Sequence, residues 1–212
     1  MDPERLKIYV VVDETLAERS GHKSLQELVS AILLGGATAI QLRGKNVKAK
    51  DLVAHGGRIR ALTADSGALL IVNDRLDVAL AVGADGVHLG ADDLPLAPAR
   101  KIAPRGFIIG GSVDTPDEAR QAEAEGADYL GAGPVFPTET KQTSNPVIGP
   151  AGLEAIVKAV SIPVVGIGGI NPGNVGEVIS TGAAGAAVAS AVVSSADPEA
   201  AVRALRSSSG MA

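Results

Sequence analysis

The sequence lacks cysteine and tryptophan, and its 212 residues include only two phenylalanines and two tyrosines. Without cysteine there is no disulfide framework and no cysteine-based metal site, although this absence alone does not fix the compartment. The core must instead be built from valine, isoleucine, leucine and alanine, which is the usual filling of parallel sheets. The length suits one large domain or two small ones, and a single α/β barrel fits it comfortably.

Positive charge and long apolar runs are also scarce. The 19 lysines and arginines are outnumbered by 24 acidic residues, and no basic stripe stands out, which argues against a nucleic-acid partner. No apolar run reaches membrane-spanning length, and residues 1–7 are charged rather than a signal peptide. We therefore expect a cytoplasmic protein without nucleic-acid or membrane partners; a homo-oligomer is left open.

Apolar segments alternate with amphipathic ones along the whole chain. The expected strands are Ile8–Val12, Ala37–Leu42, Ala68–Val72, Gly86–Leu89, Phe107–Gly110, Tyr129–Gly131, Pro163–Gly166 and Gly185–Ala189. The expected helices include Ser24–Leu34, Lys48–Ala64, Pro116–Ala124, Leu153–Ala159 and Asn174–Ile179, and Ser24 and Thr115 supply N-caps. Eight β/α units predict a (β/α)8 TIM barrel over residues 1–206, with residues 207–212 as a frayed tail.

A short motif repeats before every second expected strand. Gly-Ala pairs occur at Gly36, Gly83, Gly126 and Gly182, where glycine can adopt the left-handed conformation that ends a helix. The spacing predicts a repeated quarter-barrel. The alternative is an open doubly wound sheet, which is disfavoured because the first β/α junction carries no GxGxxG motif.

Polar residues gather where the expected strands end, which is where barrel enzymes place their chemistry. Gln41 and Arg43 should share one face of a strand, with Leu42 on the other and Gly44 and Lys45 just beyond. An amide beside two cations predicts a receptor for a polyanion and for something neutral next to it. The alternative is a solvated strand end.

Asp74 and Asp93 follow neighbouring strands, so their loops could converge on one ion. Two carboxylates, water and phosphate oxygens are a ligand set typical of Mg²⁺, and the absence of cysteine and of paired histidines disfavours zinc. With Arg43, Lys45 and Lys141 nearby, this site predicts a diphosphate ligand. The alternatives are a surface ion pair of Asp74 with Arg75 and helix-start roles for Asp92 and Asp93.

The glycines at 166, 168 and 169, together with Ala189 and Ser190 before a helix-like stretch, predict a second site for a phosphate monoester. The alternative is that these glycines only permit tight packing of the barrel. The signal is shared by many barrel families and names no substrate.

The three histidines suggest no acid–base pair. His22 and His55 are expected to be exposed, whereas His88 should face the barrel interior as a packed, hydrogen-bonded side chain. Cationic clamps without an evident acid–base pair favour a reaction in which a leaving diphosphate ionises with electrostatic help.

Several segments together resemble the thiamine phosphate synthase family over about residues 8 to 205. They are Gln41-Leu-Arg-Gly-Lys45, Asn73-Asp-Arg75, Gly86-Val-His-Leu-Gly-Ala-Asp-Asp93, Gly133-Pro-Val-Phe-Pro-Thr-Glu-Thr-Lys141 and Gly166-Ile-Gly-Gly-Ile170. The segment that ends at Lys141 is the most specific and the segment from Gly166 the least. That family joins a hydroxymethylpyrimidine diphosphate to a thiazole phosphate and releases pyrophosphate.

The resemblance implies a role for each matching residue. The residues that would hold the pyrimidine diphosphate are Gln41, Leu42, Arg43, Gly44, Lys45, Asn73, Ser112 and Lys141. Those that would hold the thiazole phosphate are Thr138, Glu139, Thr140, Gly169, Ala189 and Ser190. Asp74 and Asp93 would bind one Mg²⁺, while Arg43, Lys45, Ser112 and Lys141 would stabilise the leaving group. Gly44 and Ala189 stand where family members often carry larger residues, so we expect altered fit rather than lost activity.

Three other functions are weighed against this one. A thiazole tautomerase with the same barrel would not need the whole diphosphate clamp, and a non-catalytic phosphate-binding barrel would not need both Asp74 and Asp93. A phosphosugar epimerase would need an opposed acid–base pair, and none stands out. The sequence therefore favours a transferase of the thiamine phosphate synthase type.

Overall fold

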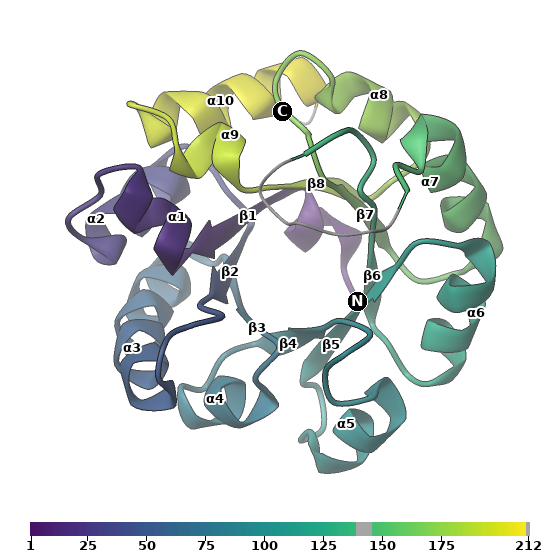
Figure 1. Cartoon of the computed structure of the whole chain (residues 1–212), viewed down its shortest axis with the longest axis horizontal. Helices are drawn as coiled ribbons and strands as arrows, with labels where there is room; N and C mark the ends of the chain where they lie inside the picture. Colours follow the sequence, from purple (N-terminus) through teal and green to yellow (C-terminus); the bar gives the residue numbers. More distant parts are fainter. Residues whose placement is uncertain (139–145, 211–212) are drawn as a thin grey trace.

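The protein, described by a computed structural model over residues 1–138 and 146–210, is a closed barrel of eight parallel strands in the order β1 to β8 (Figure 1). The predicted (β/α)8 fold is confirmed. The strands are β1 (Ile8–Asp13), β2 (Ala39–Arg43), β3 (Leu69–Asn73), β4 (Gly86–Leu89), β5 (Ile108–Val113), β6 (Tyr129–Ala132), β7 (Val164–Ile167) and β8 (Gly185–Val188).

The end of β5 differs from the prediction, because the strand continues through Gly110 and Gly111 to Val113. The paired glycines look like a strand end in sequence, yet they pair in register with Tyr129 and Leu130 of β6. A side chain at Gly110 would place its Cβ 2.2 Å from Cζ of Tyr129. Glycine is required there by the neighbouring ring, and Ser112 consequently lies within the strand.

Helices surround the barrel and cover its outer face (Figure 1). They are η1 (Pro3–Leu6, a 3₁₀ helix), α1 (Glu14–Arg19), α2 (Leu25–Leu34), α3 (Ala49–Ser66), α4 (Leu76–Ala81), α5 (Leu96–Ile102), α6 (Pro116–Ala124), α7 (Gly149–Ala159), α8 (Val175–Ser180), α9 (Ser190–Val193) and α10 (Pro198–Ser209). No helix in these described ranges is long and apolar enough to cross a membrane.

Capping residues explain where several helices begin. The start of α7 and the end of α10 differ from the prediction. The hydroxyls of Ser24 and Thr115 accept hydrogen bonds from Glu27 N and Glu118 N, so both predicted N-caps are confirmed. Helix α7 begins at Gly149, earlier than expected, because Pro150 sits comfortably in a first helical turn. Helix α10 continues to Ser209 and ends at Gly210 in the left-handed conformation, so residues 207–209 are helical rather than frayed.

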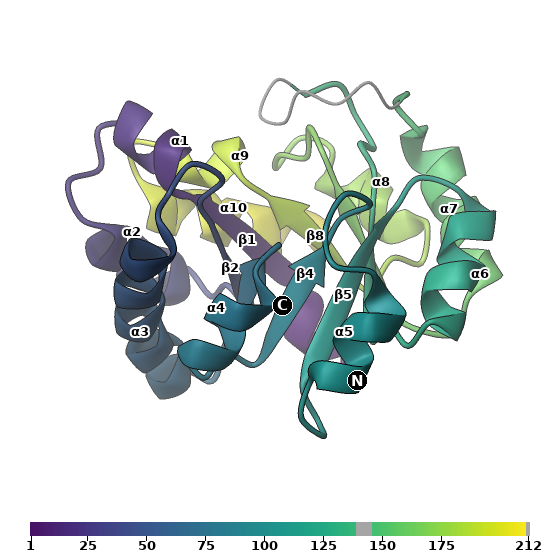
Figure 2. The ribbon, with the colours of Figure 1, turned by 60° about the horizontal axis from the view of Figure 1, so that its bottom comes forward.

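Two apolar cores lie on the two sides of the strands. The larger core fills the space between barrel and helices, and the smaller one lies inside the barrel, where Tyr9, Tyr129 and Leu6 are fully or almost fully buried. Leu6 belongs to η1 and packs at the amino ends of the strands. Figure 2 shows the N-terminus at the opposite end of the barrel from α1 and α9.

The repeated Gly-Ala motif marks a repeated structural unit. All four motif glycines have positive φ, as predicted: Gly36 (95°), Gly83 (63°), Gly126 (95°) and Gly182 (88°). In each unit the residue after Gly-Ala donates its backbone N–H to a carbonyl at the start of the preceding odd strand. In three units its side chain also accepts from an N–H there, at 3.1 Å for Thr38 and 2.8 Å for Asp85 and Asp128. The quarter-barrel is therefore held by a local clamp at the amino ends of the strands.

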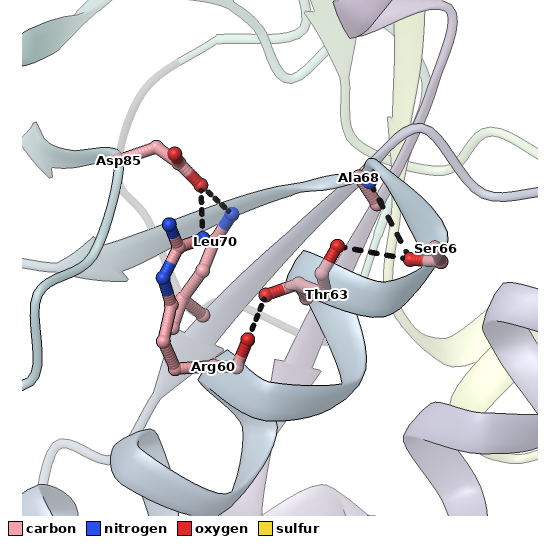
Figure 3. A network of polar contacts seen from close by, with 6 residues as sticks. All are labelled: Arg60, Thr63, Ser66, Ala68, Leu70 and Asp85. Carbon is pink, nitrogen blue, oxygen red and sulfur yellow. Dashed lines mark hydrogen bonds and ion pairs between the residues drawn. The ribbon is translucent and has the colours of Figure 1, made fainter.

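Two of these clamps recruit an arginine. Asp85 accepts from Leu70 N and from Nη1 of Arg60, at 2.8 and 2.9 Å (Figure 3). Asp128 accepts from Ile109 N and from Arg100 in the same way. Figure 3 also shows the end of α3 near the clamp formed by Asp85. There the hydroxyl of Ser66 donates to Thr63 O and accepts from Ala68 N. Polar groups at this end of the barrel satisfy one another.

Candidate active site

The carboxyl end of β2 places its side chains as the alternation predicts. Leu42 lies in the outer core and is fully buried, while Gln41 points into the barrel, where its Nε2 donates to the Tyr9 hydroxyl at 2.7 Å. Arg43 donates to the carboxylate of Asp13, the last residue of β1. Asp13 also caps α1 through Leu16 N at 2.9 Å. The Arg43 guanidinium is therefore held in place before any ligand arrives.

The turn after β2 explains Gly44 and exposes Lys45. A Cβ at Gly44 would lie 2.8 Å from Cδ2 of Leu52 and 2.9 Å from Cγ2 of Val47, so the space for a larger side chain is already filled. Lys45 is exposed, and its positive charge lowers the pKa of Asp74, which follows the neighbouring strand β3. The small residue at position 44 thus reflects local packing.

Asp74 and Asp93 meet, as predicted. Asp74 follows β3 with a φ of 62°, in the left-handed region that few non-glycine residues adopt, and its N–H donates to His88 O at 2.8 Å. Burial, a hydrogen bond with Asp93 and the charge of Asp93 raise the pKa of Asp74 to about 6, whereas Lys45 and Arg43 oppose that rise. The two carboxylates and two cations therefore form one electrostatic unit.

The alternative interpretations of the acidic residues are not supported. Arg75 pairs with Asp77 at 2.6 Å rather than with Asp74. Helix α5 begins after Pro95, and Asp93 instead accepts from Gly90 N at 2.7 Å within the loop. Asp74 is therefore not part of a surface ion pair with Arg75, and Asp93 does not begin a helix. Both carboxylates lie at the mouth.

The chemistry of this pair suits a hard cation that brings other ligands with it. Within residues 1–138 and 146–210, no group of three or more His, Cys, Asp or Glu side chains is placed to hold a metal ion. Mg²⁺ commonly uses one or two carboxylates and completes its shell with water and phosphate oxygens. Two facing carboxylates, one with a raised pKa, would also lose their mutual repulsion when a cation lies between them.

Polar side chains continue inward from the mouth. His88 Nε2 lies 3.0 Å from Ser112 Oγ and its Nδ1 lies 3.0 Å from the Tyr129 hydroxyl, which confirms a packed, hydrogen-bonded histidine. Tyr129 and Tyr9 join their hydroxyls at 2.8 Å. Burial raises the pKa of both tyrosines, so at neutral pH they act as neutral phenols. Asn73 ends β3 in register with His88.

The other side of the mouth is formed by the loops after β6, β7 and β8. Gly168 and Gly169 have φ values of 99° and 66°, and a Cβ at Gly169 would lie 2.5 Å from Pro137 O. Asn174 Nδ2 donates to Gly169 O at 3.0 Å, and Ala189 and Ser190 lead from β8 into α9. The prediction that Gly166 belongs to this phosphate site is wrong. Gly166 lies within β7 and faces Val178 and Leu153 of the outer core, so close packing explains the glycine.

Thr138 lies in the long loop after β6, at the end of the described range 1–138, and it is half-buried. The predicted site residues Glu139, Thr140 and Lys141 lie outside the described residues. Their expected roles therefore stay predictions that rest on the resemblance.

Two histidines are less exposed than predicted, and one aspartate and two tyrosines of the site were not predicted. His22 and His55 are half-buried rather than exposed, because His22 Nε2 contacts Val193 O at 2.8 Å and His55 Nδ1 contacts Glu14 Oε1 at 2.8 Å. Asp13, Tyr9 and Tyr129 were not among the predicted site residues. Asp13 could have been found, since it stands at a strand end like the other site residues. The tyrosines could not, because they lie in the middle or at the start of apolar runs.

This arrangement defines a class of protein. A (β/α)8 barrel whose mouth joins a carboxylate pair to an arginine and a lysine, and whose upper interior carries neutral polar side chains, is a barrel enzyme suited to an anionic substrate with a neutral polar part. Solved structures below a quarter sequence identity share this fold, among them a 3-hexulose-6-phosphate synthase at 20% identity with a TM-score of 0.68.

Closer comparisons identify the family. The family model described as thiamine monophosphate synthase matches residues 8–192. Thiamine-phosphate synthases of Moorella thermoacetica and Pyrococcus horikoshii are 54% and 52% identical over 94% and 96% of this chain and over 93% and 94% of their own. A solved structure of thiamine phosphate pyrophosphorylase from Pyrococcus furiosus superposes with a TM-score of 0.89 at 48% identity, over 99% of this chain and 98% of that one. The chain belongs to the thiamine monophosphate synthase family, which confirms the resemblance and the expected transferase class.

Proposed function

We propose that the protein transfers the hydroxymethylpyrimidine methyl group from its diphosphate to the ring nitrogen of thiazole phosphate, releasing pyrophosphate and forming thiamine phosphate. The observation that carries this proposal is the meeting of Asp74 and Asp93 with Arg43 and Lys45 at one mouth. Such a unit is built for a substrate that gains negative charge as it reacts.

The reaction needs no proton transfer at its central step. The bond between the pyrimidine methylene carbon and the diphosphate oxygen breaks, and its electron pair leaves with the diphosphate. The thiazole nitrogen then supplies the electron pair of the new carbon–nitrogen bond. This balance agrees with a mouth that offers charge and hydrogen bonds, where His88 bonds to Ser112 and to Tyr129.

The residues at the mouth would each contribute a distinct interaction. Arg43, held by Asp13, offers its remaining guanidinium N–H groups without a search through rotamers. Lys45 adds an exposed charge that adjusts to the ligand. Ser112 adds a hydroxyl at the end of β5. Asp74 and Asp93 would hold one Mg²⁺, which when bound would neutralise diphosphate charge.

The second substrate would bind on the opposite side of the mouth. The loops after β7 and β8 supply Gly169, Ala189 and Ser190, and Thr138 approaches from the loop after β6. Thiazole phosphate is the ligand assigned to this side, because phosphates in barrel enzymes commonly bind at these two loops. Lys141, Glu139 and Thr140 would complete the two subsites.

The test follows pyrophosphate release by purified protein with pyrimidine diphosphate, thiazole phosphate and Mg²⁺. We expect release only when all three are present. Asp93→Asn should lower kcat by about 10²- to 10³-fold, the effect typical of removing one preorganised electrostatic contact. Asp92→Asn is the matched control, since Asp92 is the exposed neighbour and should keep wild-type activity. No release by the wild type, with either substrate still binding alone, would overturn the proposal and favour a tautomerase or a binding role.

A further inference from the structure

Five polar side chains from five different strands form a continuous chain across the barrel interior. It runs from Gln41 (β2) to Tyr9 (β1) at 2.7 Å, to Tyr129 (β6) at 2.8 Å, to His88 (β4) at 3.0 Å and to Ser112 (β5) at 3.0 Å. We call these five residues the relay. Its two ends, Gln41 and Ser112, are residues that the resemblance assigns to the pyrimidine diphosphate, but nothing in the proposed function uses its middle.

The barrel leaves space for the middle of the relay. A Cβ at Gly110 would lie 2.5 Å from the Tyr129 hydroxyl oxygen, and one at Gly131 would lie 3.0 Å from Cε1 of His88. The rings of Tyr9 and Tyr129 stand 6.0 Å apart, and those of His88 and Tyr129 stand 5.5 Å apart. Missing side chains on β5 and β6 thus admit two aromatic rings and an imidazole where small apolar residues would otherwise fill the core.

The donors and acceptors of the relay fit only one direction of donation. Gln41 Nε2 carries hydrogens alone, so the Tyr9 oxygen must accept from it. The Tyr9 hydrogen then goes to Tyr129, and the Tyr129 hydrogen to Nδ1 of His88, whose Nε2–H donates to Ser112. In the opposite direction Tyr9 would accept twice and its own hydrogen would lack a partner in a buried site.

We propose that Tyr9 and Tyr129 are positioning residues that couple Gln41 to Ser112, so that Gln41 presents its carbonyl oxygen and Ser112 its hydroxyl hydrogen to the ligand. The inference rests on the proposed function and deepens it. The matching ligand is a nitrogen heterocycle with an N–H donor at the Gln41 end and an anionic phosphate oxygen at the Ser112 end. The reversed direction would favour a ligand with an acceptor at Gln41.

Kinetic coupling distinguishes the relay from simple packing. Tyr129→Phe keeps the ring but cuts the chain, and we expect kcat/KM for pyrimidine diphosphate to fall about tenfold with KM for thiazole phosphate unchanged. Ser112→Ala should then lower activity much less in the Tyr129→Phe background than in the wild type, because Ser112 has already lost its orientation. If the two losses simply multiply, Tyr129 only packs and the proposal is wrong.

Two further variants serve as a second test and as a control. Tyr9→Phe interrupts the relay at another point and should reproduce the coupling with Ser112→Ala, which keeps the test decisive if Tyr129→Phe folds poorly. Thr63→Val is the matched control, because it also removes a buried hydroxyl, one that donates to Arg60 O near the amino ends of the strands. It should leave kcat/KM unchanged; a tenfold fall there would show that losing any buried hydroxyl has this effect and would overturn the proposal.

A spectroscopic readout separates failure of the relay from failure of the proposed function. The protein has no tryptophan and only two tyrosines, both in the relay, so its near-ultraviolet tyrosine bands report on the relay alone. Binding of pyrimidine diphosphate without the second substrate should shift these bands, and Gln41→Ala should abolish the shift. Turnover without any shift would overturn the relay and leave the function standing. A shift without turnover would support the relay and reject the function.

Discussion

The two ends of the barrel use the same residue types for opposite purposes. At the amino end, Asp85 and Asp128 each accept from a backbone N–H and from an arginine, so each carboxylate is paired with a cation of the protein itself (Figure 3). At the carboxyl end, Asp74 faces another carboxylate, and burial together with this neighbour raises the pKa of Asp74 to about 6. A satisfied aspartate stabilises a fold, whereas an aspartate forced against a like charge marks a site that awaits a ligand.

One arginine–aspartate pair at each end of the barrel, Arg43 with Asp13 and Arg60 with Asp85, offers the strongest test of this difference. Arg43→Gln should lower kcat by about 10²- to 10³-fold, because it removes a preorganised donor and leaves Asp13 buried without its partner. Arg60→Gln, at the amino end, should keep kcat within about twofold because its partner Asp85 lies far from the mouth. Both should lower the melting temperature. Steady-state kinetics and thermal melts of the two variants make the comparison, and equal losses of kcat would remove the distinction between the ends.

The amino-end clamp should matter for stability. Asp128→Ala leaves Ile109 N without its side-chain acceptor and Arg100 without its carboxylate, so we expect a loss of about 1–3 kcal/mol in the free energy of unfolding. For a chain of this size that corresponds to a fall of roughly 2–10 °C in melting temperature. Circular dichroism melts measure it, with kcat at 25 °C as the control. A variant that melts like the wild type but loses activity would show that the clamp serves the site.

At the carboxyl end, replacing an aspartate should have the opposite effect and raise the free energy of unfolding at neutral pH. The folded-state pKa of Asp74 is raised from 3.8 to about 6, so its ionisation is disfavoured in the folded protein. The contribution of Asp74 to stability should therefore be largest below about pH 4, fall as the pH rises to about 6 and stay lower above that range. Asp74→Asn should raise the melting temperature of the chelator-treated protein at neutral pH, and the gain should vanish near pH 4.

Melting curves across that pH range, with and without Mg²⁺, test the prediction. Mg²⁺ should stabilise the wild type more than Asp74→Asn, because only the wild type keeps both carboxylates. If Asp74→Asn is less stable than the wild type at neutral pH, Asp74 stabilises the fold and the prediction is wrong.

The smallest effect is expected where an ion pair lies on the surface beside the site. Arg75 and Asp77 bond at 2.6 Å, but both side chains are exposed, so Arg75→Ala should change the free energy of unfolding by no more than about 0.5 kcal/mol. Activity should be unchanged, because Arg75 pairs with Asp77 rather than with Asp74. A large loss of pyrophosphate release would contradict this prediction and would place Arg75 in the diphosphate site.

Much of this architecture was predictable from local patterns. The alternation of segments, the Gly-Ala motifs and the polar residues at strand ends predicted the closed barrel, and Gln41, Arg43, Asp74, His88 and Asp93 lie where those patterns place them. Such predictions succeed because each depends on neighbouring residues: side chains alternate along a strand, and glycine allows a left-handed helix end. The same reasoning misjudged β5, because its glycines are required by a ring on another strand.

Local sequence patterns are sufficient to predict the barrel, the end that carries the chemistry and the charge available there. Which charges meet, and which side chains they hold, depends on contacts between residues that are far apart in the chain. Asp13 reaches Arg43 across 30 residues and Tyr9 reaches Tyr129 across 120, from strands that are not neighbours in the case of the tyrosines. These contacts exist because closing the barrel brings the inward faces of all its strands around one axis, and no local pattern in the chain records which partners will stand opposite each other.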